Sequence, residues 1–282
     1  MTVEHDKQIG MAGDRALHVD LYAPDSSVPN KRTAVVLVHG GGWILGDKHM
    51  VEGLGKAFAA LGYTAVAAEY RLVREAAWPA QLEDVSNAVR WVQDNADSLG
   101  VDADKVVVAG GSAGAHLAML AAKKVANVAA VLALFPASEL TVANPPPAGT
   151  FGAAVLFGEE ASDETLRSAS PLHQLDAEYP PTYLLHGADD WMIDPAASVN
   201  VYQRLVELGV PAELHVVAKA LHEFTGEPSM CGPMVGNMGL FLDRLVVEPA
   251  KYAAETEEAN LFAKGPEFVG NLMAQMLSGE GH

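Results

Sequence analysis

The chain of 282 residues is half apolar and about a fifth charged, which is the composition of an ordinary globular protein. Its 18 basic and 36 acidic residues give a formal net charge of −18. That field repels phosphate backbones, and no cluster of Lys and Arg opposes it locally, so nucleic acid is excluded as an expected partner. The single cysteine, Cys231, excludes an intrachain disulfide. No apolar run approaches the roughly 20 residues that span a membrane. The first residues lack the pattern of a secretion signal, so we expect a cytoplasmic protein without membrane association.

The N-terminal residues predict an antiparallel β-hairpin. Residues 16–22 alternate apolar with polar side chains, which is the period of a half-buried strand, and residues 2–9 precede them across a turn-rich segment at 10–14. The pattern changes at residues 33–38, where a continuous run of apolar and β-branched residues predicts a strand that is covered on both faces.

The rest of the body alternates strands of this buried type with helices. The alternation predicts an α/β fold with a mostly parallel central sheet and helices on both faces. Such sheets bind ligands at the carboxyl ends of their strands, so catalytic residues are expected there. The further strands are predicted at residues 64–68, 106–109, 128–135, 182–185 and 212–217, and the helices at residues 54–61, 80–96, 113–125, 196–208 and 230–246.

Two segments stand outside the alternation. Residues 138–170, punctuated by Asn-Pro-Pro-Pro at 144–147, predict an excursion over the sheet edge that can form a small lid. Residues 248–282 have an amphipathic helical pattern with an acidic polar face, which argues against binding to anionic membranes. This C-terminal extension docks either on its own domain or on a second subunit, as a homodimer. We therefore divide the chain into a catalytic domain, residues 1–247, and a helical extension.

The segment Gly110-Gly111-Ser112-Ala113-Gly114 follows a predicted strand and precedes a predicted helix. It fits the pattern Gly-x-Ser-x-Gly, in which the serine stands on a strained turn and its small neighbours avoid collisions. The N-terminus of the following helix favours developing negative charge. The other interpretation is a glycine-rich turn with an incidental serine, and the strand and helix around the motif argue against it. We therefore predict that Ser112 is a nucleophile.

A second glycine-rich segment, His-Gly-Gly-Gly-Trp at residues 39–43, follows the strand at 33–38. In the α/β-hydrolase architecture, this loop supplies backbone N–H groups to an oxyanion. By analogy with that motif, we assign Gly41, Gly42 and Ala113 to an oxyanion hole. A phosphate cradle is the alternative, but no Lys-Ser or Lys-Thr follows the glycines and no Gly-x-Gly-x-x-Gly opens a helix.

A serine nucleophile needs a base, and that base needs an orienting acid. In α/β-hydrolases the chain order is serine, acid, histidine, each after a strand. Of the ten histidines, only His222 follows a late strand downstream of candidate acids, so it is the predicted base. Asp189 and Asp190 both follow the preceding strand and both fit the acid. Asp194 precedes a proline, which is more typical of a helix cap.

These motifs resemble those of the hormone-sensitive-lipase-like esterases, and most closely their compact bacterial esterase and feruloyl-esterase-like relatives. The segments Glu-Tyr-Arg-Leu at 69–72 and Trp-Pro-Ala-Gln-Leu-Glu-Asp at 78–84 continue the match, which covers roughly residues 30–245. The resemblance implies an α/β-hydrolase fold with a Ser-His-Asp triad. It favours Asp190 as the acid, because related sequences carry theirs three residues after the glycine at Gly187.

The resemblance also implies that Tyr70, Arg71 and Asp84 support the site structurally rather than catalytically. The chain departs from these relatives at its start, since only 38 residues precede the oxyanion loop where they carry a longer cap. A cleft that is open, or covered only by the excursion, mildly favours short or water-soluble esters.

The function that the resemblance implies is that of a serine carboxylesterase, which hydrolyses short-chain or small soluble carboxylic esters through an acyl-enzyme. We expect a small-molecule ester as the ligand and neither a metal nor an organic cofactor. Trp43 and Phe224 flank the site in sequence and are predicted to bind the substrate. An amidase of the arylformamidase type would use the same triad. A catalytically inactive small-molecule receptor is a further alternative, but such receptors tend to lose the base, and His222 is present.

Overall fold

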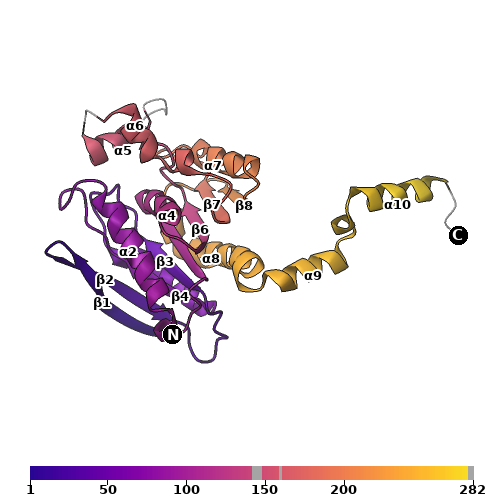
Figure 1. Cartoon of the computed structure of the whole chain (residues 1–282), viewed down its shortest axis with the longest axis horizontal. Coiled ribbons are helices and arrows are strands. Elements are labelled where there is room, and N and C mark those ends of the chain that lie inside the picture. Colours follow the sequence, from indigo (N-terminus) through magenta and orange to yellow (C-terminus); the bar gives the residue numbers. More distant parts are fainter. Residues whose placement is uncertain (142–147, 159–160, 279–282) are drawn as a thin grey trace.

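The computed structural model describes residues 1–141, 148–158 and 161–278, and an eight-stranded sheet forms its centre (Figure 1). The strands lie in the order β1-β2-β4-β3-β5-β6-β7-β8. β2 pairs antiparallel with β1 and with β4, and every later pair from β4 to β8 is parallel. The strands are β1 (Thr2–Ala12), β2 (Arg15–Ala23), β3 (Ala34–Val38), β4 (Thr64–Ala68), β5 (Val106–Gly111), β6 (Val128–Leu134), β7 (Thr182–Gly187) and β8 (Ala212–Val217).

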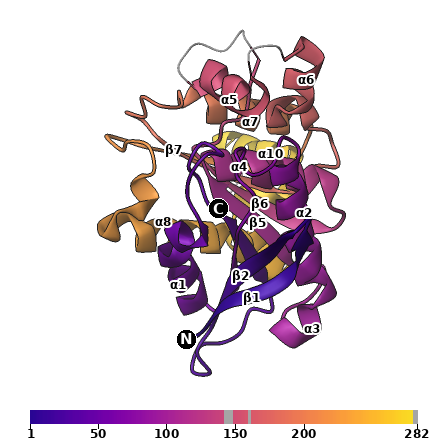
Figure 2. The same ribbon diagram turned by 90° about the vertical axis from the view of Figure 1, so that its left-hand side faces the viewer.

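Helices cover both faces of this sheet (Figure 2). Helices α2, α4 and α7 pack on one face, and α1 and α8 pack on the other. The predicted α/β-hydrolase architecture, with its antiparallel N-terminal hairpin, is thereby confirmed. The helices of the body are α1 (Glu52–Ala60), α2 (Ala80–Asp94), α3 (Ala96–Leu99), α4 (Ala113–Lys124), α7 (Ala196–Glu207) and α8 (Pro228–Leu242).

The continuous apolar run of β3 reflects burial on both of its faces. All five residues of β3 are buried. Val36 and Val38 belong to the core beneath α2 and α4, whereas Val35 and Leu37 belong to the core beneath α1 and α8. Because successive strand residues point to opposite faces, each strand of this type supplies both cores at once. The central strands are therefore fixed in place from both sides.

Several element ends differ from the sequence prediction. β5 and β7 continue two residues further, to Gly111 and Gly187. The predicted helix over 80–96 divides at Asn95, whose side-chain amide donates a hydrogen bond to the carbonyl oxygen of Trp91 at 2.8 Å. Such local side-chain bonding competes with helix continuation. The final turn of the predicted helix over 230–246 is the π-helical η4 (Asp243–Val247).

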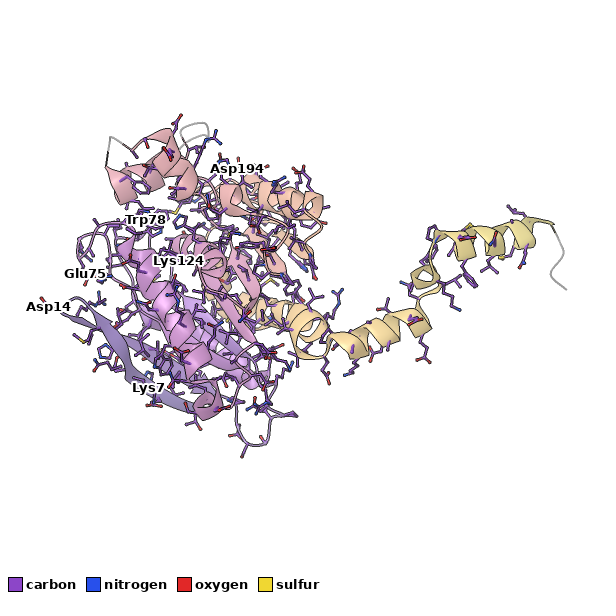
Figure 3. All side chains as sticks on the ribbon, viewed as in Figure 1. Lys7, Asp14, Glu75, Trp78, Lys124 and Asp194 are labelled. Carbon is purple, nitrogen blue, oxygen red and sulfur yellow. The ribbon has the colours of Figure 1, made fainter. Side chains whose placement is uncertain are left out.

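The excursion over residues 138–170 forms helices that pack on the body. Leu156 and Leu166 are buried in the core that also holds α2 and α4. The ring of Phe157 meets the ring of Trp78 edge-on at 5.8 Å between centroids, and Figure 3 labels Trp78 beside these helices. The predicted Asn-Pro-Pro-Pro break lies outside the described residues, and a lid function stays a prediction. The elements are α5 (Ala148–Phe157), α6 (Asp163–Ser168) and η2 (Pro171–Gln174).

The C-terminal extension projects from the body as a string of short helices (Figure 1). Helix α9 packs against η4 and η5, and α10 packs against η5. Phe262, Met276 and Leu277 are 68%, 75% and 89% exposed. None of the helices in the described parts of the chain combines the length and apolarity needed to cross a membrane. The elements are α9 (Pro249–Ala259), η5 (Leu261–Lys264) and α10 (Pro266–Ser278).

Removal of residues 249–282 is expected to leave the Tm of the body within about 2 °C of the full chain, because the extension adds little to either core. Thermal unfolding followed by circular dichroism measures this. The matched truncation removes residues 228–282 and takes away α8, whose Val235, Met238 and Phe241 are buried. It should prevent cooperative folding. A fall of more than about 5 °C for the first truncation would show that the extension stabilises the body.

Candidate active site

Ser112 stands alone between β5, which ends at Gly111, and α4, which begins at Ala113. Its backbone has φ 57° and ψ −122°, a conformation that costs a non-glycine residue about 1–3 kcal/mol. The surrounding packing holds this turn. A Cβ atom built on Gly114 would lie 2.2 Å from the carbonyl oxygen of Val38, at the end of the neighbouring β3. The close approach of α4 to β3 therefore requires glycine at this position.

The structure brings Ser112, His222 and Asp190 into one hydrogen-bonded chain. Nε2 of His222 lies 3.0 Å from Oγ of Ser112, and Nδ1 of His222 lies 2.7 Å from Oδ2 of Asp190. The three residues follow β5, β8 and β7, so they meet at the carboxyl ends of parallel strands, as the sequence predicts. This arrangement allows the imidazole to accept the serine proton while the carboxylate fixes the ring.

Asp190 is held ionised by its surroundings. Burial opposes ionisation, but hydrogen bonds from His186 and His222 and from the N–H of Ile193 outweigh it and hold the pKa of the carboxyl well below its usual range. Its Oδ1 accepts the N–H groups of Met192 and Ile193 at 2.9 and 3.0 Å. The carboxylate is therefore both charged and fixed in orientation.

The other two candidate acids lie elsewhere. Asp189 is exposed, and its carboxylate accepts a hydrogen bond from Nζ of Lys219 at 3.2 Å. Oδ1 of Asp194 accepts the N–H of Ala196, the first residue of α7, at 2.8 Å, although the N-cap position itself is occupied by Pro195. Neither has a hydrogen bond to His222, so Asp190, which the resemblance favours, is the candidate acid that the geometry places against the base.

A second Ser-His-Asp group lies behind the first. Nδ1 of His186 lies 2.7 Å from Oγ of Ser198, and Nε2 of His186 lies 3.2 Å from Oδ2 of Asp190. Ser198 is wholly buried inside α7, whereas Ser112 is 7% exposed and stands on a turn. A substrate can reach Ser112 but not Ser198, so this second group supports the carboxylate rather than supplying a nucleophile.

Glycines set the backbone conformation of the loop His39–Trp43. Gly41 and Gly42 have φ 99° and 57°, and a Cβ atom built on Gly41 would lie 2.2 Å from the carbonyl oxygen of Leu45. Among the described residues, the N–H groups of Gly41 and Gly42 have no acceptor. Ala113 is the first residue of α4, and its N–H has no partner inside that helix. These groups are free to donate to a ligand.

Tyr70 lies beneath this loop. Its hydroxyl lies 3.2 and 3.3 Å from the carbonyl oxygens of His39 and Gly40, to which it donates, and its ring stacks on His39 with 4.3 Å between centroids. Beside it, Arg71 forms a two-pronged ion pair with Asp84, with Nε–Oδ2 and Nη2–Oδ1 distances of 2.8 Å. These contacts agree with the structural role expected for the three residues.

A cavity of about 350 Å³ opens beside the nucleophile. Trp43 and Phe224 are 3% and 2% exposed, and neither is among the residues that line this cavity, so a contact of either with substrate stays a prediction. Trp43 meets His116 edge-on, and Phe224 packs near Phe135. The lining residues are Gly40, Met50, Val51, Gly53, Leu54, Gly111, Leu134, Phe135, Glu223, Thr225, Gly226, Pro228 and Cys231.

Within the described residues, one group of side chains has the geometry of a metal site: His5, Asp20 and His49, whose ligand atoms lie within 4.8 Å of one another. It lies on β1, β2 and η1 (Lys48–Val51) and shares no residue with the triad. Nζ of Lys48 lies 3.4 Å from the Asp20 carboxylate and already balances part of its charge. The triad and the cavity supply no comparable ligand set.

Sequence reasoning missed His186 and Glu223. His186 directly follows the predicted strand at residues 182–185 and stands four residues before Asp190, and that spacing is a usable signal for a contact with the acid. Glu223 follows the predicted base directly, and only the path of the backbone shows that its side chain lines the cavity.

Replacing Gly114 with alanine is expected to lower the free energy of unfolding by about 3 kcal/mol or more, because the new methyl group has no room beside β3. Chemical denaturation measures this. Gly236→Ala is the matched control, since Gly236 lies in α8 with nothing within 4 Å of a built Cβ. It should stabilise the protein by about 0.5–1 kcal/mol. Equal effects of both changes would contradict the close approach described for Gly114.

Comparison with known proteins agrees with this geometry. Residues 19–205 match the model of the BD-FAE family. The chain is 30% identical over 208 residues to the esterase LipQ of Mycobacterium tuberculosis. The aligned region covers 66% of this chain and 49% of LipQ. It is 35% identical over 125 residues to the carboxylesterase NlhH of the same species, covering 44% of this chain and 39% of NlhH. The chain thus spans about half the length of LipQ.

Among solved structures, the thermophilic esterase Est2 of Thermogutta terrifontis is similar in fold. Its TM-score is 0.73 at 25% identity, with 86% of this chain and 93% of that chain covered.

Proposed function

The chain belongs to the BD-FAE family, and from this membership and the contacts of Ser112 we propose that it is a serine carboxylesterase. The observation that carries the proposal is the chain of hydrogen bonds from Ser112 through His222 to Asp190. The relatives LipQ and NlhH are named as an esterase and a carboxylesterase, and this supports the same class of reaction.

In the first half of the proposed reaction, Oγ of Ser112 attacks the ester carbonyl carbon while Nε2 of His222 takes its proton. Asp190 stabilises the imidazolium that forms and keeps its ring in place. The negative charge that develops on the carbonyl oxygen is stabilised by the N–H groups of Gly41, Gly42 and Ala113. The tetrahedral intermediate then collapses, and the alcohol leaves with the proton of His222.

In the second half, water attacks the acyl-enzyme along the same route. His222 accepts a proton from the water, the oxyanion again rests on the backbone N–H groups, and the carboxylic acid departs as Ser112 regains its proton. The ester and one water molecule balance the two halves, and His222 carries the proton in both directions.

The size of the cavity supports a substrate with a short acyl chain or another small group. A volume of about 350 Å³ lies at the low end of the range for small-molecule sites. Its walls are mainly apolar, with Leu54, Leu134 and Phe135 among them. A buried group of a few carbons fits there, whereas a long lipid chain would have to extend into solvent.

A catalytically inactive receptor is not favoured by this geometry. A receptor has no need of a strained serine within hydrogen-bond reach of an oriented histidine. Backbone strain of this kind persists only where the surrounding packing holds it, and it is concentrated at functional sites. The same triad chemistry acts on ester and amide carbonyls, so an aryl formamide distinguishes the two classes of substrate.

The test is hydrolysis of p-nitrophenyl esters from acetate to palmitate, with an aryl formamide in parallel and Ser112→Ala as the control. We expect the highest kcat/KM with short acyl groups, and a loss of at least about ten-thousandfold in the variant, because the nucleophile is gone. Ser198→Ala is the matched variant and should lose far less activity than Ser112→Ala, since Ser198 is buried away from substrate and reaches Asp190 only through His186. Cleavage of the formamide alone would show that the protein is an amidase and not an esterase. If the folded protein cleaved neither substrate, the inactive receptor would be the remaining interpretation.

A further inference from the structure

Of the described residues that line the cavity beside Ser112, only Glu223 has a charged side chain. The other lining residues are glycines, apolar residues, a threonine, a proline and Cys231. Burial raises the pKa of the Cys231 thiol, so this group is neutral at physiological pH. The electrostatic character of an otherwise apolar cavity is therefore set by one carboxylate.

This carboxylate lies next to the reacting groups. A Cβ atom built on Gly40 would lie 3.0 Å from Oε1 of Glu223 and 3.5 Å from Cβ of Ser112. Glu223, the oxyanion loop and the nucleophile thus approach the same point. A group of the substrate that fills the cavity while its carbonyl carbon faces Ser112 must pass close to this carboxylate.

The backbone holds Glu223 in a conformation that favours glycine. Its φ is 59° and its ψ is 18°, in the left-handed region, which is uncommon for a side chain of this size. The turn is closed by a hydrogen bond from the N–H of Gly226 to the carbonyl oxygen of Glu223 at 2.9 Å. Its neighbours are His222, which is fixed by the triad, and Phe224, which is buried. The backbone of Glu223 is thereby held directly beside the base.

Among the described residues, no side chain or backbone group forms a hydrogen bond or ion pair with this carboxylate. The other acids of the region have partners: Asp190 binds His222, Asp84 binds Arg71 and Asp189 binds Lys219. Glu223 is exposed at the cavity, so water solvates it in the free protein. A ligand can therefore replace that water without breaking a contact of the protein.

We propose that Glu223 forms a subsite for a cationic group, so that the protein prefers esters that carry an ammonium or guanidinium group and disfavours esters that carry a carboxylate. The proposal rests on the esterase function and deepens it. The preference arises because a cation in the cavity is attracted to the carboxylate while an anion is repelled. A cation also neutralises the carboxylate, whose field would otherwise oppose the nearby oxyanion, so part of the gain should appear in kcat.

The size of the preference is limited by solvent. Glu223 is exposed, so the attraction is screened and corresponds to about a tenfold change in kcat/KM rather than a larger one. The overall charge of −18 acts in the same direction, but it lies mostly further away and salt screens it more strongly.

The test compares matched esters that differ only in charge. One pair is acetylcholine and its carbon isostere, in which a tert-butyl group replaces the trimethylammonium group. The other is the p-nitrophenyl ester of γ-trimethylammoniobutyric acid and its carbon isostere, with the monoester of glutaric acid as the anion. The two pairs place the charge in the alcohol and in the acyl part respectively. We expect the cationic member of at least one pair to have a kcat/KM about tenfold above that of its isostere.

Glu223→Gln keeps the shape of the side chain and removes its charge, so the ratio between cationic ester and isostere should fall to about one. Glu227→Gln is the matched control, because Glu227 is an exposed acid four residues further on that does not line the cavity. It should keep the ratio of the unaltered protein. A ratio near one in the unaltered protein, or a ratio that Glu223→Gln leaves unchanged, would overturn the subsite while the esterase function stands. Failure of folded protein to cleave any of these esters would overturn both.

Discussion

The close approach of the α4 N-terminus to the end of β3 is the constraint on which the site depends. Gly114 permits contact distances to the backbone of Val38 that no side chain allows. With that contact in place the chain turns sharply between β5 and α4, and Ser112 is the residue of the turn whose backbone is strained. The same contact places the glycine-rich loop at residues 39–43, which follows β3, beside Ser112. Packing of the two central elements therefore creates both halves of the reacting centre.

The remaining groups reach this centre because parallel strands end at one edge. His222 and Asp190 follow β8 and β7, which lie on the same side of β5 in the sheet. Asp190 fixes His222, and the next residue, Glu223, lines the cavity. The proposed base, His222, and the charged residue of the cavity, Glu223, are thus adjacent residues of one short turn. A change in that turn would alter both, which explains why discrimination between charged substrates and rate are expected to be linked.

The central strands were predictable because they are buried on both faces and appear in the sequence as unbroken apolar runs, as β3 and β4 do. Ser112 and His222 were predictable from motif, chain order and strand ends. Asp190 was favoured over Asp189 only through the resemblance, by its position three residues after Gly187, and the folded turn places Asp190 against His222 and Asp189 against Lys219. Glu223 was missed for a related reason: its left-handed backbone is a tertiary effect, with no glycine to mark it. Residues 248–282 show an amphipathic pattern, but a pattern names no partner, and the structure shows α10 projecting from the body.

The most direct test of the account is covalent labelling with paraoxon, which phosphorylates an activated serine. Mass spectrometry of the intact protein and of its peptides would locate the adduct and follow its rate in Asp190→Asn and Asp189→Asn. The account predicts one adduct, on Ser112, formed at the unaltered rate in Asp189→Asn and at least about a hundredfold more slowly in Asp190→Asn, because only Asp190 orients His222. An adduct on Ser198, or equal rates in the two variants, would contradict it.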